Sequence, residues 1–304
     1  FLGMVRDLFR FYRQAPSLLD GDGPGPGIGD WLDDNGYGEA FRDDHLVPMA
    51  SALWSSPPEQ ILAFPARYLV QFMANHQMLQ VSGRPEWRVV RGGSSTYVSA
   101  LRARWQVQER LRCPVRSVTR DAHGVIVDSV VGSERFDRIV LACHSDQALA
   151  LLGDASDAER DVLGAIAYQP NEVVLHTDAS VLPRHRKAWA AWNAFVPGTP
   201  GAPCTVSYCM NLLQGLRSPE PFVVTLNRSE AIDPAKVLRR LRYHHPVYDA
   251  ASVAAQQRKA AIQGHNHTWF AGAYWGWGFH EDGMRSAVDV AAGLGVDWPQ
   301  GAAA

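Results

Sequence analysis

The part of this chain that most restricts its fold lies near the C-terminal end, where an apolar run passes through a glycine- and tryptophan-rich stretch into an amphipathic segment. Residues 268–271 predict a short strand, and Glu281 and Asp282 fall in the first turn of a predicted helix. Val288 and Ala291 then repeat at helical spacing, so one face of that helix is expected to pack against a core. The order is therefore strand, glycine turn, helix.

A glycine turn between a strand and a helix suits a polar cofactor. Glycine lets backbone N–H groups approach a ligand closely, and the N-terminal end of a helix favours negative charge. The same pattern is also typical of an ordinary buried strand, turn and helix that bind nothing. From the pattern alone both interpretations stand.

The actual residues of this segment are more informative than its strand, turn and helix pattern. The run FAGAYWGWGFHEDGMRSAVDVA, residues 270–291, resembles the last FAD-binding segment of the flavin-dependent amine oxidase superfamily, most closely its bacterial group of predicted NAD/FAD-binding proteins. The resemblance implies that Gly272 and Ala273 lie along the ribityl and phosphate region of FAD, and that Gly283 and Met284 lie at the flavin edge. A helix N-terminus there would stabilise the charge of a reduced flavin. One departure is Ala273, because many relatives have an acidic residue at that position.

Two further stretches have counterparts in the same superfamily. Residues 87–98 predict a strand, a double glycine and a helix running to about Glu109, and the resemblance places Gly92 and Gly93 against the flavin. Without the resemblance a double glycine is more often an ordinary turn. Val115 matches a position whose main chain pairs with the adenine edge, although the residue reads equally well as a plain sheet valine.

Three β-rich runs occupy the middle of the chain. Residues 114–120, 124–128 and 136–143 are rich in β-branched and aromatic side chains and are separated by turn residues. They predict a small antiparallel meander that leads into one buried, nearly all-apolar strand.

The remaining segments alternate between helical and strand-like patterns. Residues 1–12 predict an amphipathic helix, and residues 31–79 predict a series of helices separated by prolines. Helices are also expected at 145–152 and 158–167. Strands are expected at 172–177, 188–195, 205–210 and 222–226.

The resemblance arranges these segments into two interleaved domains of a mixed α/β and α+β fold. It implies the helical part of a substrate domain at 1–90, the middle of a Rossmann-like FAD-binding domain at 91–150, the antiparallel-sheet part of the substrate domain at 151–261, and a C-terminal FAD-binding segment at 262–304. The FAD-binding domain is expected to be partial, because superfamily members begin with a strand and a G-x-G-x-x-G turn that this sequence lacks. Since the chain opens at Phe1 within a helical pattern, we expect an N-terminally truncated fragment.

Few side chains suggest direct chemistry, as expected where a flavin performs the redox step. Tyr274, Trp275 and Trp277 could line an apolar substrate pocket, although such aromatics are also ordinary core residues. His280 is the best single candidate for a catalytic polar group, with loop packing as its alternative. Several histidines occur in pairs, but no spacing predicts a metal site.

Composition restricts the partners. The formal net charge is −2, and no block of basic residues indicates nucleic-acid binding. No apolar run is long enough to span a membrane, and no signal-peptide pattern opens the chain, so a cytoplasmic protein is expected. The four cysteines are scattered and read as free thiols.

These observations favour an FAD-dependent oxidoreductase that transfers hydride from a small organic or lipid-like substrate to the flavin. The competing hypothesis is a non-catalytic binding protein that kept the flavoprotein fold without the cofactor. The sequence identifies neither the substrate nor the oligomeric state.

Overall fold

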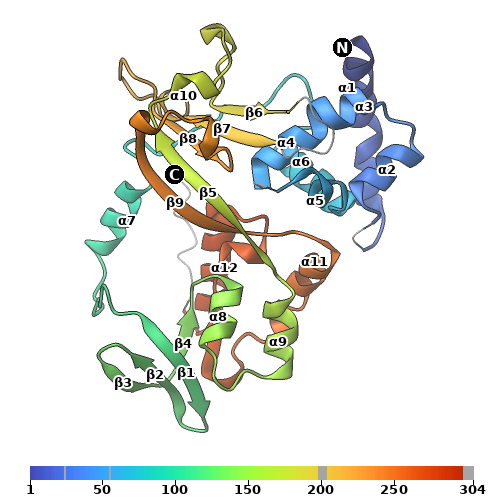
Figure 1. The fold of residues 1–304 in the computed structure, drawn as a ribbon. Helices are drawn as coiled ribbons and strands as arrows, with labels where there is room; N and C mark the ends of the chain where they lie inside the picture. The colour runs from blue at the N-terminus through green and yellow to red at the C-terminus, as the bar shows by residue number, and fades with distance from the viewer. Residues whose placement is uncertain (24, 55, 198–203, 297–304) are drawn as a thin grey trace. The chain divides into compact units, whose positions relative to one another are not determined.

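The computed structural model describes residues 1–23, 25–54, 56–197 and 204–296 (Figure 1). The chain divides into two compact units. Unit 1 comprises residues 1–107 and 169–245, and unit 2 comprises residues 108–168 and 246–304, of which 297–304 lie outside the described part. The domain assignment expected from the sequence, with boundaries after residues 90, 150 and 261, stays a prediction.

The first part of unit 1 is helical. Its helices are α1 (Leu2–Gln14), α2 (Ile28–Asp34), α3 (Glu39–Phe41), α4 (Val47–Trp54), α5 (Pro58–Leu62), α6 (Ala66–Asn75) and α7 (Ser95–Arg102), and a π-helical turn, Arg42–Leu46, links α3 to α4. The series of short helices expected from the prolines is therefore present. α7 differs from the others because none of its residues is buried.

Aromatic side chains hold the first helices of unit 1 together. The ring of Phe11, which is fully buried, lies 5.8 Å from that of Trp31 and 5.4 Å from that of Phe41. Tyr37 completes the cluster, and the Arg10 guanidinium lies over its ring at 3.8 Å. Large rings packed edge to face contribute more than their buried area alone.

The second part of unit 1 is a five-stranded sheet with the order β6-β7-β8-β5-β9. Side chains alternate along each strand, so the register of strand pairing decides which residues lie on each face of the sheet. One face carries Val173, Val206 and Leu226, which pack with Ala52 of α4. The other carries an apolar cluster that includes Val174 and Cys209. The strands are β5 (Tyr168–His176), β6 (Trp192–Phe195), β7 (Thr205–Cys209), β8 (Val223–Leu226) and β9 (Val237–Pro246), and the short helix α10 (Met210–Gln214) follows β7.

Unit 2 combines an antiparallel meander with a two-stranded parallel sheet. The meander has the order β1-β2-β3, and β4 pairs in parallel with β10. Helices α8 and α9 lie side by side in Figure 1 and bury Ala148, Val162 and Leu163 in the core. The elements are β1 (Val115–Asp121), β2 (Gly124–Ser129), β3 (Gly132–Phe136), β4 (Ile139–Leu141), α8 (Ser145–Leu151), α9 (Asp157–Gly164), α11 (Ala250–Gln257), β10 (Thr268–Phe270) and α12 (His280–Gly293).

An ion-pair network is buried in unit 2. The Arg120 side chain, 2% exposed, donates from Nη1 and Nη2 to the two carboxylate oxygens of Glu159, at 2.6 and 2.9 Å. Its Nε donates to Asp154 at 2.9 Å. Glu159 also accepts from the N–H and hydroxyl of Ser156, which closes a capping box at the start of α9. Strand β1 and helix α9 are thereby joined through charge.

Three sequence expectations need correction. The strand expected near residues 87–90 does not form, because this stretch pairs with no strand among the described residues and its side chains are exposed. The following helix ends at Arg102, well before Glu109. In the apolar run 136–143, Phe136 ends β3 and only residues 139–141 form the short strand β4, of which Leu141 is buried while Val140 is 42% exposed. An apolar run indicates that a segment tends to form a strand. Whether its side chains are buried depends on another strand or helix packing against it, which the run itself does not determine.

Two strands were not expected. β3 is exposed along its whole length and pairs only with β2. β9 is ten residues long, but its arginines and histidines hide the strand pattern. Both lie at sheet edges, where charged side chains are tolerated because one strand flank faces solvent.

Candidate cofactor segment and substrate cavity

The C-terminal segment forms the strand, turn and helix that its sequence predicts. Strand β10 pairs with β4 so that Phe270 lies opposite Leu141, and the Ala271 N–H donates to the Leu141 carbonyl at 3.0 Å. A short 3₁₀ turn, Ala273–Trp275, follows, and α12 begins at His280. The turn therefore lies at the carboxyl end of a parallel strand pair, the usual position of ligand sites in such sheets.

Two glycines of this turn are required by the protein's own packing. A Cβ atom at Gly272 would lie 2.2 Å from Cε1 of Tyr274, and one at Gly276 would lie 2.2 Å from Oδ1 of Asp282. Both neighbours are buried and cannot move aside cheaply. The sequence attributed the glycine turn to a ligand, and the structure adds this internal reason for it.

Hydrogen bonds inside the turn use several of its polar groups. The Gly272 N–H donates to the Ser286 hydroxyl at 2.9 Å. The Asp282 carboxylate, buried at the third position of α12, accepts from the N–H groups of Trp277 and Phe279 at 3.1 and 3.0 Å. The Gly272 N–H is therefore engaged within the protein. By contrast, the N–H groups of Ala273 and Tyr274 have no acceptor among the residues that the structure describes.

These features fit the anionic portion of a flavin cofactor. The two N–H groups without an acceptor lie beside the N-terminal end of the fourteen-residue helix α12, where the helix dipole is positive. Gly283 adjoins them, since a Cβ there would lie 3.8 Å from the Ala273 nitrogen. His280, Glu281 and Met284 are exposed at the same helix end.

The aromatic residues of the segment differ in their surroundings. Tyr274 is 3% exposed and belongs to the core of unit 2. Its hydroxyl has no hydrogen-bond partner among the described residues, and burial, with Tyr168 and Cys143 nearby, raises its pKa far above the usual value. Trp275 packs on the same core and donates from Nε1 to the Phe270 carbonyl at 3.0 Å. Trp277 is half-buried. Their assignment to a substrate pocket stays a prediction.

Three other residues were predicted from the sequence to contact the cofactor: Gly92, Gly93 and Val115. Gly92 and Gly93 form the expected turn, with φ angles of 81° and 84°, but they belong to unit 1. Ser94 precedes α7 without a capping side-chain hydrogen bond. Val115 opens β1 opposite Ser129 and is 37% exposed. Contact of these three residues with a cofactor stays a prediction.

A large apolar cavity lies within unit 1. Its volume is about 620 Å³, in the range of small-molecule sites. Pro48, Met49, Ala52 and Leu53 come from α4, and the other walls come from residues distant in sequence. Those residues are Met78, Arg84, Trp87, Ala190, Ala191, Trp192, Ala194 and Leu213.

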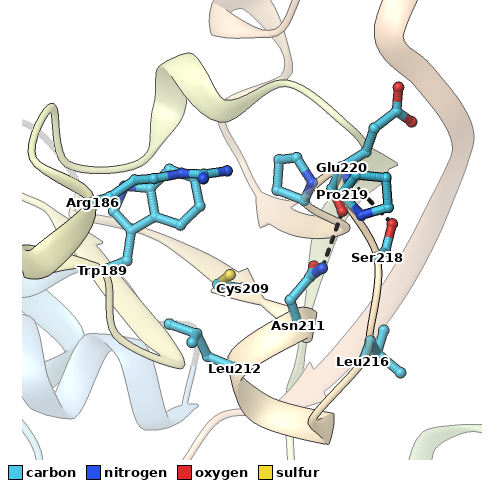
Figure 2. Close-up of a pocket in the computed structure, with 10 residues that line it drawn as sticks. Arg186, Trp189, Cys209, Asn211, Leu212, Leu216, Ser218, Pro219 and Glu220 are labelled. Carbon is cyan, nitrogen blue, oxygen red and sulfur yellow. Dashed lines mark hydrogen bonds between the residues drawn. The ribbon is translucent and has the colours of Figure 1, made fainter.

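A second cavity of unit 1, about 300 Å³, is smaller and more polar. Figure 2 shows Arg186 and Trp189 on one side, Asn211 and Pro219 on the other, and Cys209 between them. The Asn211 side chain donates to the Glu220 carbonyl at 3.0 Å and accepts from the Phe222 N–H at 2.7 Å. Its amide therefore holds the neighbouring loop, which makes the large cavity the better candidate for a substrate.

A chain of neutral polar groups is buried in the sheet of unit 1. The Asp178 N–H donates to Nδ1 of His176 at 3.1 Å, so Nε2 carries the ring proton and donates to the Thr225 hydroxyl at 2.8 Å. Thr225 in turn bonds Ser207 at 2.8 Å. Burial lowers the pKa of His176, although Asp178 partly opposes this.

Sequence reasoning missed the Arg120 network, the polar chain and both cavities. Only one part was readable in advance: Ser156 followed three residues later by Glu159 is a capping-box pattern.

Among the described residues no group of three or more His, Cys, Asp or Glu side chains could hold a metal ion. The four cysteines are free. The described helices include none with the length and apolar character needed to cross a bilayer.

Comparison with known protein families gives one match. The family described as flavin-containing amine oxidoreductase matches residues 32–188, which is just over half of the chain. No protein of curated function matches the sequence.

Solved structures with similar folds include, by name, oxidases and a fatty acid isomerase, and they are distant from this chain in sequence. Cyclohexylamine oxidase from Brevibacterium oxydans IH-35A gives a TM-score of 0.63 at 14% identity, over 95% of this chain and 74% of that one. Putrescine oxidase bound to putrescine gives 0.64 at 12% identity, over 96% and 75%. A fatty acid isomerase from P. acnes that produces CLA gives 0.60 at 15% identity, over 89% and 67%. At these identities the likeness establishes the mixed fold, and this chain spans two thirds to three quarters of those chains.

Proposed function

Because the chain belongs to the flavin-containing amine oxidoreductase family, a family of FAD-dependent oxidoreductases, we propose that it takes part in the oxidation of a small organic substrate held in the large cavity of unit 1. A flavin, when bound, would supply the hydride acceptor. The enzyme hypothesis is thereby favoured over the non-catalytic binding protein. The proposal rests above all on the β10–turn–α12 segment, whose N–H groups of Ala273 and Tyr274 are available to a ligand.

We assign the residues of this segment separate tasks. The N–H groups of Ala273 and Tyr274 would donate to the polar chain of the cofactor, and the N-terminal end of α12 would face its negatively charged part. Gly283 keeps that helix end open to close approach. His280 is exposed beside it and remains the candidate polar group at the flavin.

The cavity constrains the substrate. Nearly all of its lining side chains are apolar, so it suits a substrate whose body is mostly hydrocarbon. Relatives of this fold include, by name, oxidases of cyclohexylamine and putrescine and an isomerase of fatty acids. The fold therefore accommodates both basic and acidic substrates, and the lining of each cavity must decide between them.

The first test is flavin binding by the purified 304-residue chain. We expect the visible flavin absorption spectrum to shift when the chain is titrated with FAD, and the bound flavin to bleach when substrate is added without oxygen. A chain that leaves the FAD spectrum and fluorescence unchanged at all concentrations would contradict the proposal.

A glycine variant locates the cofactor. Gly283→Ala places a methyl group in ordinary contact with Ala273, and alanine favours the helix by up to ~1 kcal/mol, so the chain should be as stable as before or more stable. FAD affinity should fall about tenfold, because the methyl group blocks close approach to the helix end. The control is Gly3→Ala in α1, where a Cβ meets nothing within 4 Å. Equal FAD affinity in both variants would place the flavin away from this helix end.

A further inference from the structure

Among the described residues that line the large cavity, Arg84 is the one with a charged side chain. The other lining residues are alanine, leucine, methionine, proline and tryptophan, and no carboxylate is among the described residues of the lining. A cavity of this kind gives an apolar body its contacts and leaves a single positive group to recognise a polar end.

Hydrogen bonds hold Arg84 in place without neutralising it. Its Nε donates to the Gln80 carbonyl at 2.7 Å, and Nη2 donates to the Tyr12 hydroxyl at 2.9 Å. All of these acceptors are neutral, including the Met78 carbonyl at 3.5 Å. Within the described part of the chain Arg84 forms no ion pair, and its Nη1 has no acceptor. Two N–H donors of a positioned guanidinium are thus open to a ligand.

His45, whose pKa Arg84 influences, does not share the charge. Burial and the positive charge of Arg84 both lower the pKa of His45, so this imidazole stays neutral at neutral pH. Arg84 therefore provides the positive charge at this site, and a protonated amine placed in the same cavity would meet repulsion and no carboxylate.

We propose that the large cavity binds an apolar carboxylic acid, with the substrate carboxylate on Arg84 and its hydrocarbon body along Met49, Leu53 and Trp192. This rests on the proposed function, since it names the substrate class of the same cavity. A carboxylate suits the site better than a phosphate does, because its single negative charge is matched by the one guanidinium, whereas a doubly charged phosphate would meet only one cation.

Binding of matched ligands to the 304-residue chain tests the proposal. Decanoate and decylamine carry similar apolar bodies and opposite charges, and Trp87 and Trp192 in the lining report binding through their fluorescence. We expect decanoate to bind at least about tenfold more tightly than decylamine, the ratio that a charge-assisted hydrogen bond supports. Equal affinities, or tighter binding of the amine, would overturn the proposal.

Variants assign the effect to Arg84. Arg84→Gln should weaken decanoate about tenfold and leave decylamine unchanged or slightly tighter. The matched control is Arg13→Gln, which removes an exposed arginine next to Tyr12 in α1 that has no ion pair among the described residues. Equal loss in both variants would indicate a general charge effect, and the assignment to Arg84 would be wrong.

A chain-length series on the unaltered protein keeps the proposal testable even if a variant misfolds. Octanoate, nonanoate and decanoate should gain about three- to fourfold in affinity for each methylene group, because each is buried against apolar walls. A flat series would exclude the cavity as the site of the hydrocarbon chain. Failure here is distinguishable from failure of the proposed function: carboxylate binding without any FAD binding contradicts the latter, whereas flavin reduction by amines alone contradicts the former.

Discussion

The two units bury polar groups in opposite ways. Unit 2 buries charge, since Arg120 and Glu159 are 2% and 1% exposed and bond through both carboxylate oxygens. Unit 1 buries a neutral chain, in which His176, Thr225 and Ser207 link three neighbouring strands. Each of these buried polar groups has a hydrogen-bond partner within its own cluster, as buried polar groups generally do.

The two clusters differ in how much stability is lost when one partner is removed. In unit 2 the attraction between charges offsets a large desolvation cost, so removing one partner leaves an uncompensated charge in the core. In unit 1 the cost of a lost partner is that of one unsatisfied hydroxyl or ring N–H, provided that His176 stays neutral. Mutation should therefore damage unit 2 more strongly, whereas mild acid should reach unit 1 first.

The largest expected effect is that of Arg120→Met. It should destabilise unit 2 by about 3–5 kcal/mol, because Glu159 would remain buried without its partner. Hydrogen exchange resolved over residues 115–129 and 157–164 measures the loss, and Arg116→Met, at an exposed residue of β1, is the control. The double variant Arg120→Met, Glu159→Leu should recover part of the loss. A single variant as stable as the control would show that the network contributes nothing.

Thr225→Val should have a smaller effect in unit 1. It keeps the shape of the side chain but leaves the Nε2–H of His176 without an acceptor, at a cost of about 1–3 kcal/mol. Thr177→Val is the matched control, because the Thr177 side chain has no hydrogen bond among the described residues. Exchange protection of β5 and β8 is the measurement. A loss as large as that of Arg120→Met would remove the contrast between the two units.

The smallest expected effect is that of mild acid. His176 has a folded pKa below its unfolded value of about 6.5, so the unfolded chain takes up protons first and unit 1 loses stability as pH falls below about 6.5. His45 adds to this in the same direction. Each unit by which the folded pKa lies below the unfolded pKa costs about 1.4 kcal/mol of stability once the pH is below both values.

Unit 2 should respond to acid only at lower pH. Burial works against the charge of Glu159, but hydrogen bonds from Arg120 and Ser156 outweigh it and hold its pKa below the usual value. Its contribution is therefore present above about pH 4.3 and is lost as pH falls below that. Thermal unfolding followed by segment-resolved exchange between about pH 7 and 4.5 should weaken unit 1 alone, and His176→Gln should flatten that dependence. Parallel weakening of both units would refute the comparison.

Local elements were predictable to different degrees. The strand before Gly272 and the helix after Phe279 follow from glycine placement and apolar spacing, and both form within a few residues of the expected bounds. β9 was not predictable because charged residues at a sheet edge carry no apolar alternation. At the candidate site, Gly283 and Ala273 were named from the sequence, but the use of the Gly272 N–H by Ser286 was not.

The sequence alone determined the family, the mixed fold and the strand–glycine–helix segment, because these depend on residues close together in the chain. Only the tertiary structure decided which groups meet. It joined Arg120 to Glu159, 39 residues away, and Arg84 to Tyr12, 72 residues away. It also enclosed a cavity with walls from α4 and β6. Such contacts depend on packing between distant segments, and no local pattern records which distant partner a side chain will find.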